Sequence, residues 1–598
     1  MILQSLNHLY RRLAEDPDNG LPTPGYSLQN ITFCIVIRED GTVVQFLDAR
    51  KSVIAIDKNG KERSSIVPIE ILVPGQSKSS GQGINPCTLW DNLTYLAGYP
   101  QPDRNTEKAE KNRIRAPKCF EGSRDHHVRL FAHQDVASSH LAVARYFTRY
   151  TPVELLPFVE SLPEDARKGN GVFQLSGETS YAHKGYRQIE QSESDAPPDQ
   201  PNQCLVTGKN GPIARLHEPK IKTFDPKGSL LVSFNEAAYE SYGKTGKEAG
   251  QGRNSPVSDD ATFAYCNALN WLLARKERRF RIGDATAVFW TAEATPAEAL
   301  FPALMSGVPD AEDQGTKQRV HDILEKISRG TLGTDELGDP NTEFFILGLS
   351  PNASRLSVRF WHTGTLRNLI GNLKLHLNQL ELVRQWDETN SKNPEPVRPS
   401  SYQLLRQTAR DADGIPPLLG GALMRSILLG AAYPSSLITA VQNRIRAERD
   451  VSYLKAAILK AWLIRNNNQN ITTMLDETNT NPGYRLGRLF AVLEKAQQDA
   501  LPGINSTIRD RFYASASATP RAVFGRLLRT YQHHLGKLDE KLKGYREKQT
   551  QEILAALRDF PAHLNLENQA QFALGYYHQR KDFFTKKETQ PPTETANV

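Results

Sequence analysis

Strand patterns nearly vanish from this chain after residue 400, and this change limits the folds open to it. Upstream, short runs rich in apolar residues or alternating apolar with polar ones are typical of β-strands, at 31–73, 205–234, 287–292 and 344–361. Downstream, apolar residues recur with helical spacing in 401–411, 416–430, 434–448, 451–466, 484–500, 519–543 and 545–558. We therefore predict an α+β chain: a mixed N-terminal α/β region with β-rich segments, followed by a C-terminal all-α helical bundle.

Residues 344–361, FFILGLSPNASRLSVRFW, predict a β-hairpin. An apolar run meets the turn-forming cluster at 350–354, and an alternating run follows. In that second strand we expect Leu356, Val358 and Phe360 on one face, and the opposite face to carry Arg355, Ser357, Arg359 and Trp361.

Helices are also predicted in the N-terminal region, at 1–13, 125–168, 259–278, 294–330 and 364–385. Ser258 is the expected cap of the third of these. Within 485–497 one face of a helix should be buried, because its apolar residues share helical spacing: Leu486, Leu489, Phe490, Leu493 and Ala496.

Two polar segments indicate boundaries within the 598 residues. Proline and asparagine cluster at 390–400, NSKNPEPVRPS, and asparagine again at 466–470. We predict an N-terminal large region at 1–400, a connecting helical region at 401–473 and a C-terminal helical bundle at 474–598. The last residues, 588–598, have the composition of a disordered tail.

The basic excess of the chain is uneven. Its net charge is +7, yet residues 401–598 hold 27 Lys and Arg against 18 Asp and Glu, a net of +9, which leaves −2 for the rest. A basic helical region favours a polyanionic partner, although an ordinary solvated surface remains an alternative. No long apolar run predicts a transmembrane helix, and charge follows the short apolar stretch at the N-terminus, so we expect a cytoplasmic protein.

The sequence mostly lacks the motifs that are typical of catalytic sites. Gly243-Lys244-Thr245 lacks the upstream glycine of a phosphate-binding loop, because position 238 is alanine. The His321-Asp322 pair is one ligand pair where a metal site needs three or more ligands. The five cysteines form no C-x-x-C pair and are expected to be reduced, mostly buried thiols. We predict no catalytic centre, no metal site and no cofactor.

Two glycine-rich loops have the composition of a nucleic-acid contact. Glycine lets the backbone approach a groove, and amides and cations read base edges or hold phosphates. The candidate residues are Gln76, Lys78 and Asn85 in loop 75–86, and Lys244, Lys247, Arg253 and Asn254 in loop 241–258. A plain surface loop remains the alternative for both.

Basic side chains also recur with helical spacing in the C-terminal region, opposite apolar faces. Such stripes suit a helix that lies along a phosphate backbone, although a solvated helix face has the same pattern. The candidates are Arg485, Arg488, Lys495, Arg521, Arg526 and Arg529, with Lys537, Lys541 and Lys548 on a further face.

Several segments together resemble the large subunit of type I-C CRISPR effector complexes, the Cascade class, in order along nearly the whole chain. They are LWDNLTYLAGY (89–99), CLVTGKNGPIARLHEPKIK (204–222), SFNEAAYESYGK (233–244), NSPVSDDATFAYCNALNWLL (254–273), GDATAVFW (283–290), FFILGLSPNASRLSVRFW (344–361), PPLLGGALMRSILLGAAYP (416–434), NPGYRLGRLFAVLEKAQ (481–497) and FALGYYHQRKDFF (572–584). Loop 241–254 is longer than that family's usual form, so residues there do not transfer one by one.

The resemblance implies an antiviral-defence protein that is not an enzyme. A guide RNA would supply sequence specificity by base pairing, and the protein would read the short motif beside the target on double-stranded DNA and stabilise the opened strands. Implied partners are the backbone and RNA-processing subunits and the helicase–nuclease. Small subunits are also implied, made by internal translation at Met474. Rival hypotheses are a nuclease or NTPase, and a structural or regulatory protein that binds only protein partners.

Overall fold

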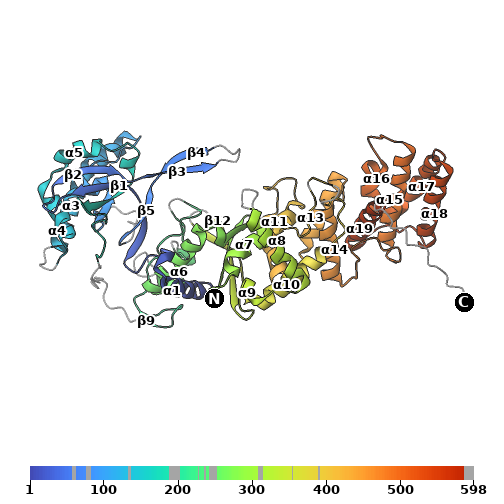
Figure 1. The fold of residues 1–598 in the computed structure, drawn as a ribbon, viewed down its shortest axis with the longest axis horizontal. Helices are drawn as coiled ribbons and strands as arrows, with labels where there is room; N and C mark the ends of the chain where they lie inside the picture. Colours follow the sequence, from blue (N-terminus) through green and yellow to red (C-terminus); the bar gives the residue numbers. More distant parts are fainter. Residues whose placement is uncertain are drawn as a thin grey trace. The chain divides into compact units, whose positions relative to one another are not determined.

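The computed structural model describes residues 1–56, 62–75, 83–131, 136–186, 202–225, 228–234, 237–241, 252–306, 314–352, 355–387, 391–392 and 394–584. The chain forms two compact units (Figure 1). We call Tyr10–Pro219 with Phe234–Asn267 the N-terminal unit, and Met1–Leu9, Lys220–Ser233 and Ala268–Val598 the C-terminal unit. The predicted α+β class is confirmed. The predicted boundaries at 400 and 473 both fall inside the C-terminal unit, and the three-part division stays a prediction.

A five-stranded sheet forms the centre of the N-terminal unit. Its long strand β1 (Tyr26–Ile37) pairs antiparallel with β2 (Val43–Asp48) and β5 (Ile69–Pro74), and parallel with β7 (Asn170–Leu175). The short β6 (Trp90–Asn92) completes the sheet. Strands β3 (Lys51–Ile56) and β4 (Glu62–Val67) pair only with each other, as the separate ribbon in Figure 1. The predicted strand-rich block at 31–73 is confirmed.

Helices α3 (Thr106–Leu130), α4 (Ser138–Arg149) and α5 (Pro152–Glu160) supply the rest of this unit's core. Burial of aromatic rings such as Phe33, Phe147 and Phe173 is the main stabilising contribution. Helix α3 begins well before the predicted start at 125, because its densely charged surface masks the apolar periodicity. The short α2 (Leu93–Leu96) follows β6 directly.

The predicted strand character over 205–234 is wrong for most of that range. Only β8 (Asn202–Gln203) and β9 (Asn210–Gly211) pair as strands, with isolated bridges beyond them. Prolines at 212 and 219 interrupt the run, since proline cannot donate to a ladder. Helix α6 (Asp259–Ala274) follows, and the amide of Ala261 donates to the Ser258 hydroxyl, as the predicted cap requires.

The C-terminal unit begins with α1 (Ile2–Ala14), whose last residues belong to the N-terminal unit, and contains a four-stranded antiparallel sheet in chain order. The strands are β10 (Arg279–Ile282), β11 (Ala285–Thr291), β12 (Glu343–Asn352) and β13 (Arg355–Thr365). The predicted hairpin at 344–361 is therefore confirmed as β12 and β13.

A β-bulge overturns the predicted faces of β13. Leu349 pairs with Val358 and Gly348 pairs with Phe360, so Arg359 is an extra residue without a partner on β12. Because paired residues share a face, Phe360 lies on the face opposite Val358, and Trp361 shares a face with Val358. Val358 is 44% exposed, and Arg359 reaches Asp284 at 2.6 Å.

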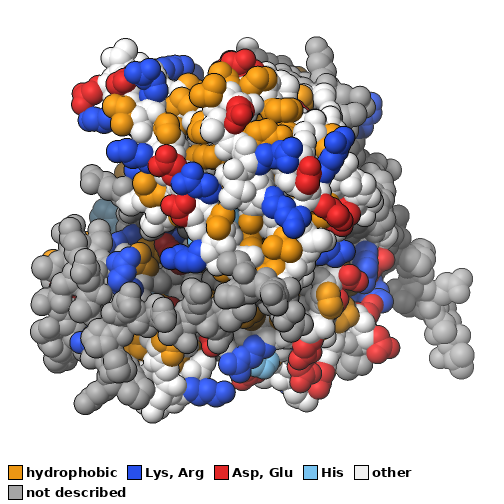
Figure 2. All heavy atoms as spheres, turned by 90° about the vertical axis from the view of Figure 1, so that its left-hand side faces the viewer, with side chains coloured by type: hydrophobic (Ala, Val, Ile, Leu, Met, Phe, Trp, Pro, Cys, Tyr) orange, Lys and Arg blue, Asp and Glu red, His pale blue; other side chains and the backbone are white. Residues whose placement is uncertain are grey.

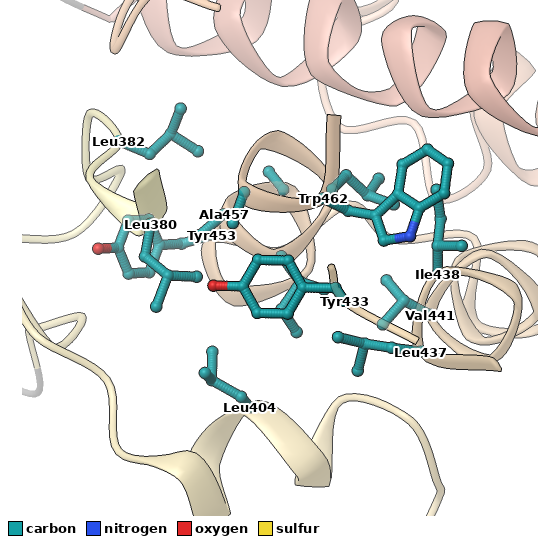
Figure 3. Close-up of a cluster of buried hydrophobic side chains, with 14 of the residues drawn as sticks. Leu380, Leu382, Leu404, Tyr433, Leu437, Ile438, Val441, Tyr453, Ala457 and Trp462 are labelled. Carbon is teal, nitrogen blue, oxygen red and sulfur yellow. The ribbon is translucent and has the colours of Figure 1, made fainter. Parts of the chain in front are cut away.

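Helices cover this sheet and extend the core. They are α7 (Ala297–Ser306), α8 (Gln314–Arg329), α9 (Thr334–Leu337), α10 (Leu366–Leu380), α11 (Ser401–Arg406), α12 (Pro417–Leu429), α13 (Ser435–Glu448) and α14 (Tyr453–Asn467). Figure 3 shows Leu380, Leu404 and Tyr433 converging on α14, which carries Tyr453 and Trp462. The same apolar cluster continues without interruption into the last helices.

Those helices are α15 (Pro482–Ala500), α16 (Ile508–Ala518), α17 (Pro520–Leu535), α18 (Glu540–Ala555) and α19 (Leu566–Asp582). The predicted buried face of α15 is confirmed at all five positions. The single helix predicted at 519–543 is wrong: α17 ends at Leu535, and Asp539 accepts the Leu542 amide as the cap of α18. Helices α16 and α19 had no prediction, because alanine, serine and polar residues dilute their apolar pattern.

Backbone contact between α15 and α19 depends on glycine. A Cβ on Gly487 would lie 2.0 Å from the carbonyl oxygen of Phe572, and one on Gly575 would lie 2.1 Å from that of Tyr484. A third glycine, Gly483, would place a Cβ 2.2 Å from the Asn568 carbonyl oxygen. Any side chain at these positions forces the two helices apart.

We predict that Gly487→Ala destabilises the protein by about 1–3 kcal/mol, the usual range for forcing atoms into a packed core. Gly544→Ala in α18 is the matched control, because a Cβ there meets nothing within 4 Å. It should be neutral or stabilising by up to about 1 kcal/mol through helix propensity. Thermal unfolding of both variants provides the measurement, and equal midpoints would contradict the packing argument.

Candidate nucleic-acid interface

Helices α17 and α18 present most of the exposed cations in the last part of the chain. Arg526, Arg529 and His533 follow one another at helical spacing on α17 and are all exposed. Lys537, just beyond α17, and Lys541, at the start of α18, are exposed as well. For Arg529, Lys537 and Lys541 no acidic partner lies within 4.0 Å among the described residues, so their charges face solvent.

The other predicted cations of this surface have contacts with their own unit. Arg521 donates to the Phe560 carbonyl at 3.1 Å and lies 3.7 Å from Asp559, although both charged groups are largely exposed. The Arg526 guanidinium sits 5.3 Å from the centre of the Phe512 ring, and Lys548 lies 4.0 Å from Glu552. These contacts fix the side chains without removing their charge from the surface.

The predicted exposed stripe on α15 is wrong at Arg488. Its side chain is buried, donates from Nε to the Gln579 amide oxygen at 3.0 Å and from Nη1 to the Glu477 carbonyl at 3.2 Å. Arg485 donates to backbone carbonyls of Asn479 and Ala556, and Lys495 pairs with Asp499. Helix α15 is central in the bundle, so its cations are held by contacts within the protein. Their binding to nucleic acid stays a prediction.

In the N-terminal unit, Asn85 is exposed on a segment that is firmly attached to α3. Arg115 donates to the Gly83 carbonyl at 2.7 Å, and Thr88 lies 2.9 Å from His126. Leu89 donates to Nε2 of His127, whose Nδ1 lies 2.7 Å from the Ser123 carbonyl oxygen. Burial lowers the pKa of His127 to about 3, so the ring is neutral and serves as an acceptor here. Gln76 and Lys78 lie outside the described residues.

Sequence reasoning missed a cation on the side of α3 that contacts the segment carrying Asn85. Lys118 is exposed on α3, about one turn from Arg115, on the helix side that meets the segment carrying Asn85. A Cβ on Gly122 would lie 2.6 Å from Ile84, which identifies that side of the helix. The spacing of Lys111, Arg115 and Lys118 was the available signal.

The second loop is attached at its C-terminal end. Asn254 accepts the Ser241 amide at 3.0 Å, and Arg253 is half-buried beside it. The residues that follow pair with the segment at 204–222. The Leu205 amide donates to the Pro256 carbonyl at 2.8 Å, and the Ala214 amide donates to the Val257 carbonyl at 2.9 Å. Lys244 and Lys247 lie outside the described residues.

Figure 2 shows how charge is distributed on the face at the left of Figure 1, where the N-terminal unit lies. Blue Lys and Arg side chains lie among acidic and hydrophobic ones on this face. Recognition of nucleic acid through this face would therefore depend on a few placed side chains.

Two further properties bear on the chemistry of the chain. Within the described ranges, His, Cys, Asp and Glu side chains do not gather in threes as metal ligands would. Among the helices that the structure describes, none has the length and apolarity needed to cross a bilayer. Four of the five cysteines are buried and all five are free thiols, as predicted.

The family described as CRISPR-associated protein (Cas_Csd1) matches residues 6–584, nearly the whole chain. No curated protein matches this sequence.

Proposed function

Because this chain belongs to the CRISPR-associated Csd1 family, we propose that it is the non-catalytic large subunit of a type I-C RNA-guided surveillance complex. The observation that carries the proposal is the family match, which spans both structural units. The guide RNA supplies sequence specificity by base pairing, and this chain reads the adjacent motif on double-stranded DNA. Its partners are the backbone and RNA-processing subunits and the helicase–nuclease, in the cytoplasm, and it needs no cofactor.

Two surfaces divide the work in this proposal. The first surface consists of Asn85 and Lys118, with Arg253 and Asn254. It reads the motif by contacting base edges and nearby phosphates. The exposed cations of α17 and α18 hold the displaced strand and stabilise the opened duplex. What supports this division is the difference in charge pattern between the two surfaces.

The alternative is a structural or regulatory protein that binds only protein partners. Salt dependence separates the two, because each phosphate contact releases counterions and steepens the fall of affinity with salt. A reconstituted complex whose affinity for motif-bearing duplex is independent of this chain would favour the alternative.

We predict that Asn85→Ala and Lys118→Ala, separately or together, weaken binding to motif-bearing duplex, by about 1–3 kcal/mol where a base contact is lost. Lys108→Ala, at the start of the same helix and paired with Asp103 at 2.8 Å, is the matched control. Affinity is measured for targets with and without the adjacent motif. If neither the single nor the combined changes alter the preference for the motif, Asn85 and Lys118 do not recognise it.

We predict that reversing Arg526, Arg529 and Lys537 to Glu leaves motif choice intact but weakens the open-strand complex. The slope of log affinity against log salt should fall by about one unit per lost phosphate contact. The same change of charge at the exposed Arg319, Lys392 and Arg410 serves as the control. An unchanged slope in the first triple variant would show that this surface does not hold the displaced strand.

The architecture around Met474 supports a second product. Met474 is 62% exposed between α14 and α15, in a segment that separates α15–α19 from the preceding helices along the chain, although one apolar cluster spans both sets of helices. Their junction with the preceding helices includes many polar contacts: Gln442 donates to the Leu566 carbonyl at 2.7 Å, and Tyr577 donates to that of Val383 at 2.8 Å. Polar contacts of this kind are also found in separable interfaces between domains.

We therefore predict internal translation from Met474, giving a basic small subunit of residues 474–598 that joins the complex beside the full-length chain. Changing codon 474 to a leucine codon should remove a band of roughly 14 kDa, the mass of an independently folding block of this length, while sparing the full-length protein. The same change at Met424 should leave the band intact. A band that persists without codon 474, or is absent from the unmodified gene, contradicts this prediction.

A further inference from the structure

A pocket with aromatic walls opens on the N-terminal unit, and its lining residue Tyr186 contacts Thr88 of the segment that carries Asn85. Its volume is about 770 Å³, within the range of roughly 300–1,000 Å³ in which proteins bind small ligands. One wall comes from the start of β1 with Tyr26 and from Leu72 of β5. The other comes from residues 179–186, which follow β7 and contribute Tyr181, His183 and Tyr186.

Hydrogen bonds to the sheet hold both walls in place. Tyr26 pairs with Pro74 in the β1–β5 ladder, and the Gly75 amide donates to the Gly25 carbonyl at 2.6 Å. Across the pocket, Ala182 donates to the Phe173 carbonyl at 2.7 Å, and Tyr181 forms a bridge with Gln174. The pocket is therefore built by the fold before any ligand arrives.

The aromatic rings are also fixed. The Tyr181 ring stacks on His183, with centres 5.8 Å apart and planes 10° apart. The Tyr186 ring meets His140 edge to face at 5.5 Å and Phe131 at 6.0 Å. Rings held in this way can stack a flat ligand with little loss of conformational entropy.

Polar groups of the pocket have unused capacity. Nδ1 of His183 is buried without a hydrogen-bond partner among the described residues. Burial lowers the pKa of His183 to about 4, so the imidazole is neutral at physiological pH. At the rim, Lys184 is exposed and has no acidic partner within 4.0 Å in the described part of the chain. Thr179 and Ser180 add hydroxyl groups, and none of the lining residues that the structure describes is acidic.

The geometry points to a binding site for one unpaired nucleotide, with the base against the Tyr181 and Tyr186 rings and the phosphate beside Lys184. Stacking between a base and an aromatic side chain is sequence-tolerant, and an exposed lysine with no carboxylate beside it among the described residues favours an anion. His183 and the two hydroxyls offer hydrogen bonds to the base edge. This inference rests on the proposed function, since a single-stranded guide end or displaced strand would supply the nucleotide.

The test uses the full-length chain carrying Arg526, Arg529 and Lys537 changed to Glu, to lower binding elsewhere. Short single-stranded poly-uridine RNA and poly-thymidine DNA, each with one iodouracil base, are cross-linked by light and the cross-linked residues are mapped. We expect cross-links within residues 179–186 and a loss of affinity of about tenfold for Tyr181→Ala, the usual effect of losing one stacked base. Tyr181→Phe should retain binding, and Tyr402→Ala, an exposed tyrosine in the other unit, should have no effect.

The two probes distinguish the source of the nucleotide. Cross-linking of the RNA alone assigns the pocket to the guide, of the DNA alone to the displaced strand, and of both to any unpaired nucleotide. If Tyr181→Ala fails to fold, Lys184→Ala tests the site instead, because replacing an exposed side chain should leave the fold intact. Cross-links only outside 179–186, with unchanged affinity in the Lys184 variant, would overturn the site. The proposed function fails separately, if the assembled complex does not bind motif-bearing duplex.

Discussion

The last five helices are arranged around one close contact, the approach of the α15 and α19 backbones at Gly483, Gly487 and Gly575. Because no side chain separates the helices there, the rings of Phe490, Tyr513 and Tyr576 gather around the crossing. Helices α16, α17 and α18 then pack around this pair. The exposed cations of α17 and α18 are thus placed by a contact made of glycine, which carries no charge itself.

Much of the architecture was predictable because periodicity reports burial directly. The buried face of α15 and the β12–β13 hairpin follow from spacing alone. The bulge at Arg359 does not, because an inserted residue is a property of the pairing between two strands and leaves no mark on one of them. Helices α16 and α19 were missed because alanine, serine and polar residues dilute the apolar pattern on which the prediction depends.

The candidate site was less predictable than the fold. Composition identified two loops, and several of their named residues lie outside the described ranges. The described ends of those loops are fixed by hydrogen bonds to distant segments, as in Leu89 with His127 and Leu205 with Pro256. Such partners are far apart in sequence, so spacing cannot reveal them. They matter because a reading side chain needs a rigid base to discriminate between similar groups.

Counting charges along the sequence does not show which cations are exposed, and this explains the wrong prediction for Arg488. The basic excess beyond residue 400 includes cations that the protein uses internally: Lys455 pairs with Glu448, Lys460 donates to the Gln379 carbonyl at 3.2 Å, and Arg546 pairs with Asp499 at 2.9 Å. Burial lowers the pKa of Lys460 to about 8, which reflects the cost of removing its charge from water. Arg488 and Arg529 were both predicted to lie on exposed basic stripes, yet the first stabilises the bundle and the second faces solvent. Net charge therefore predicts that a polyanion is attracted, while the fold decides which cations remain to meet it.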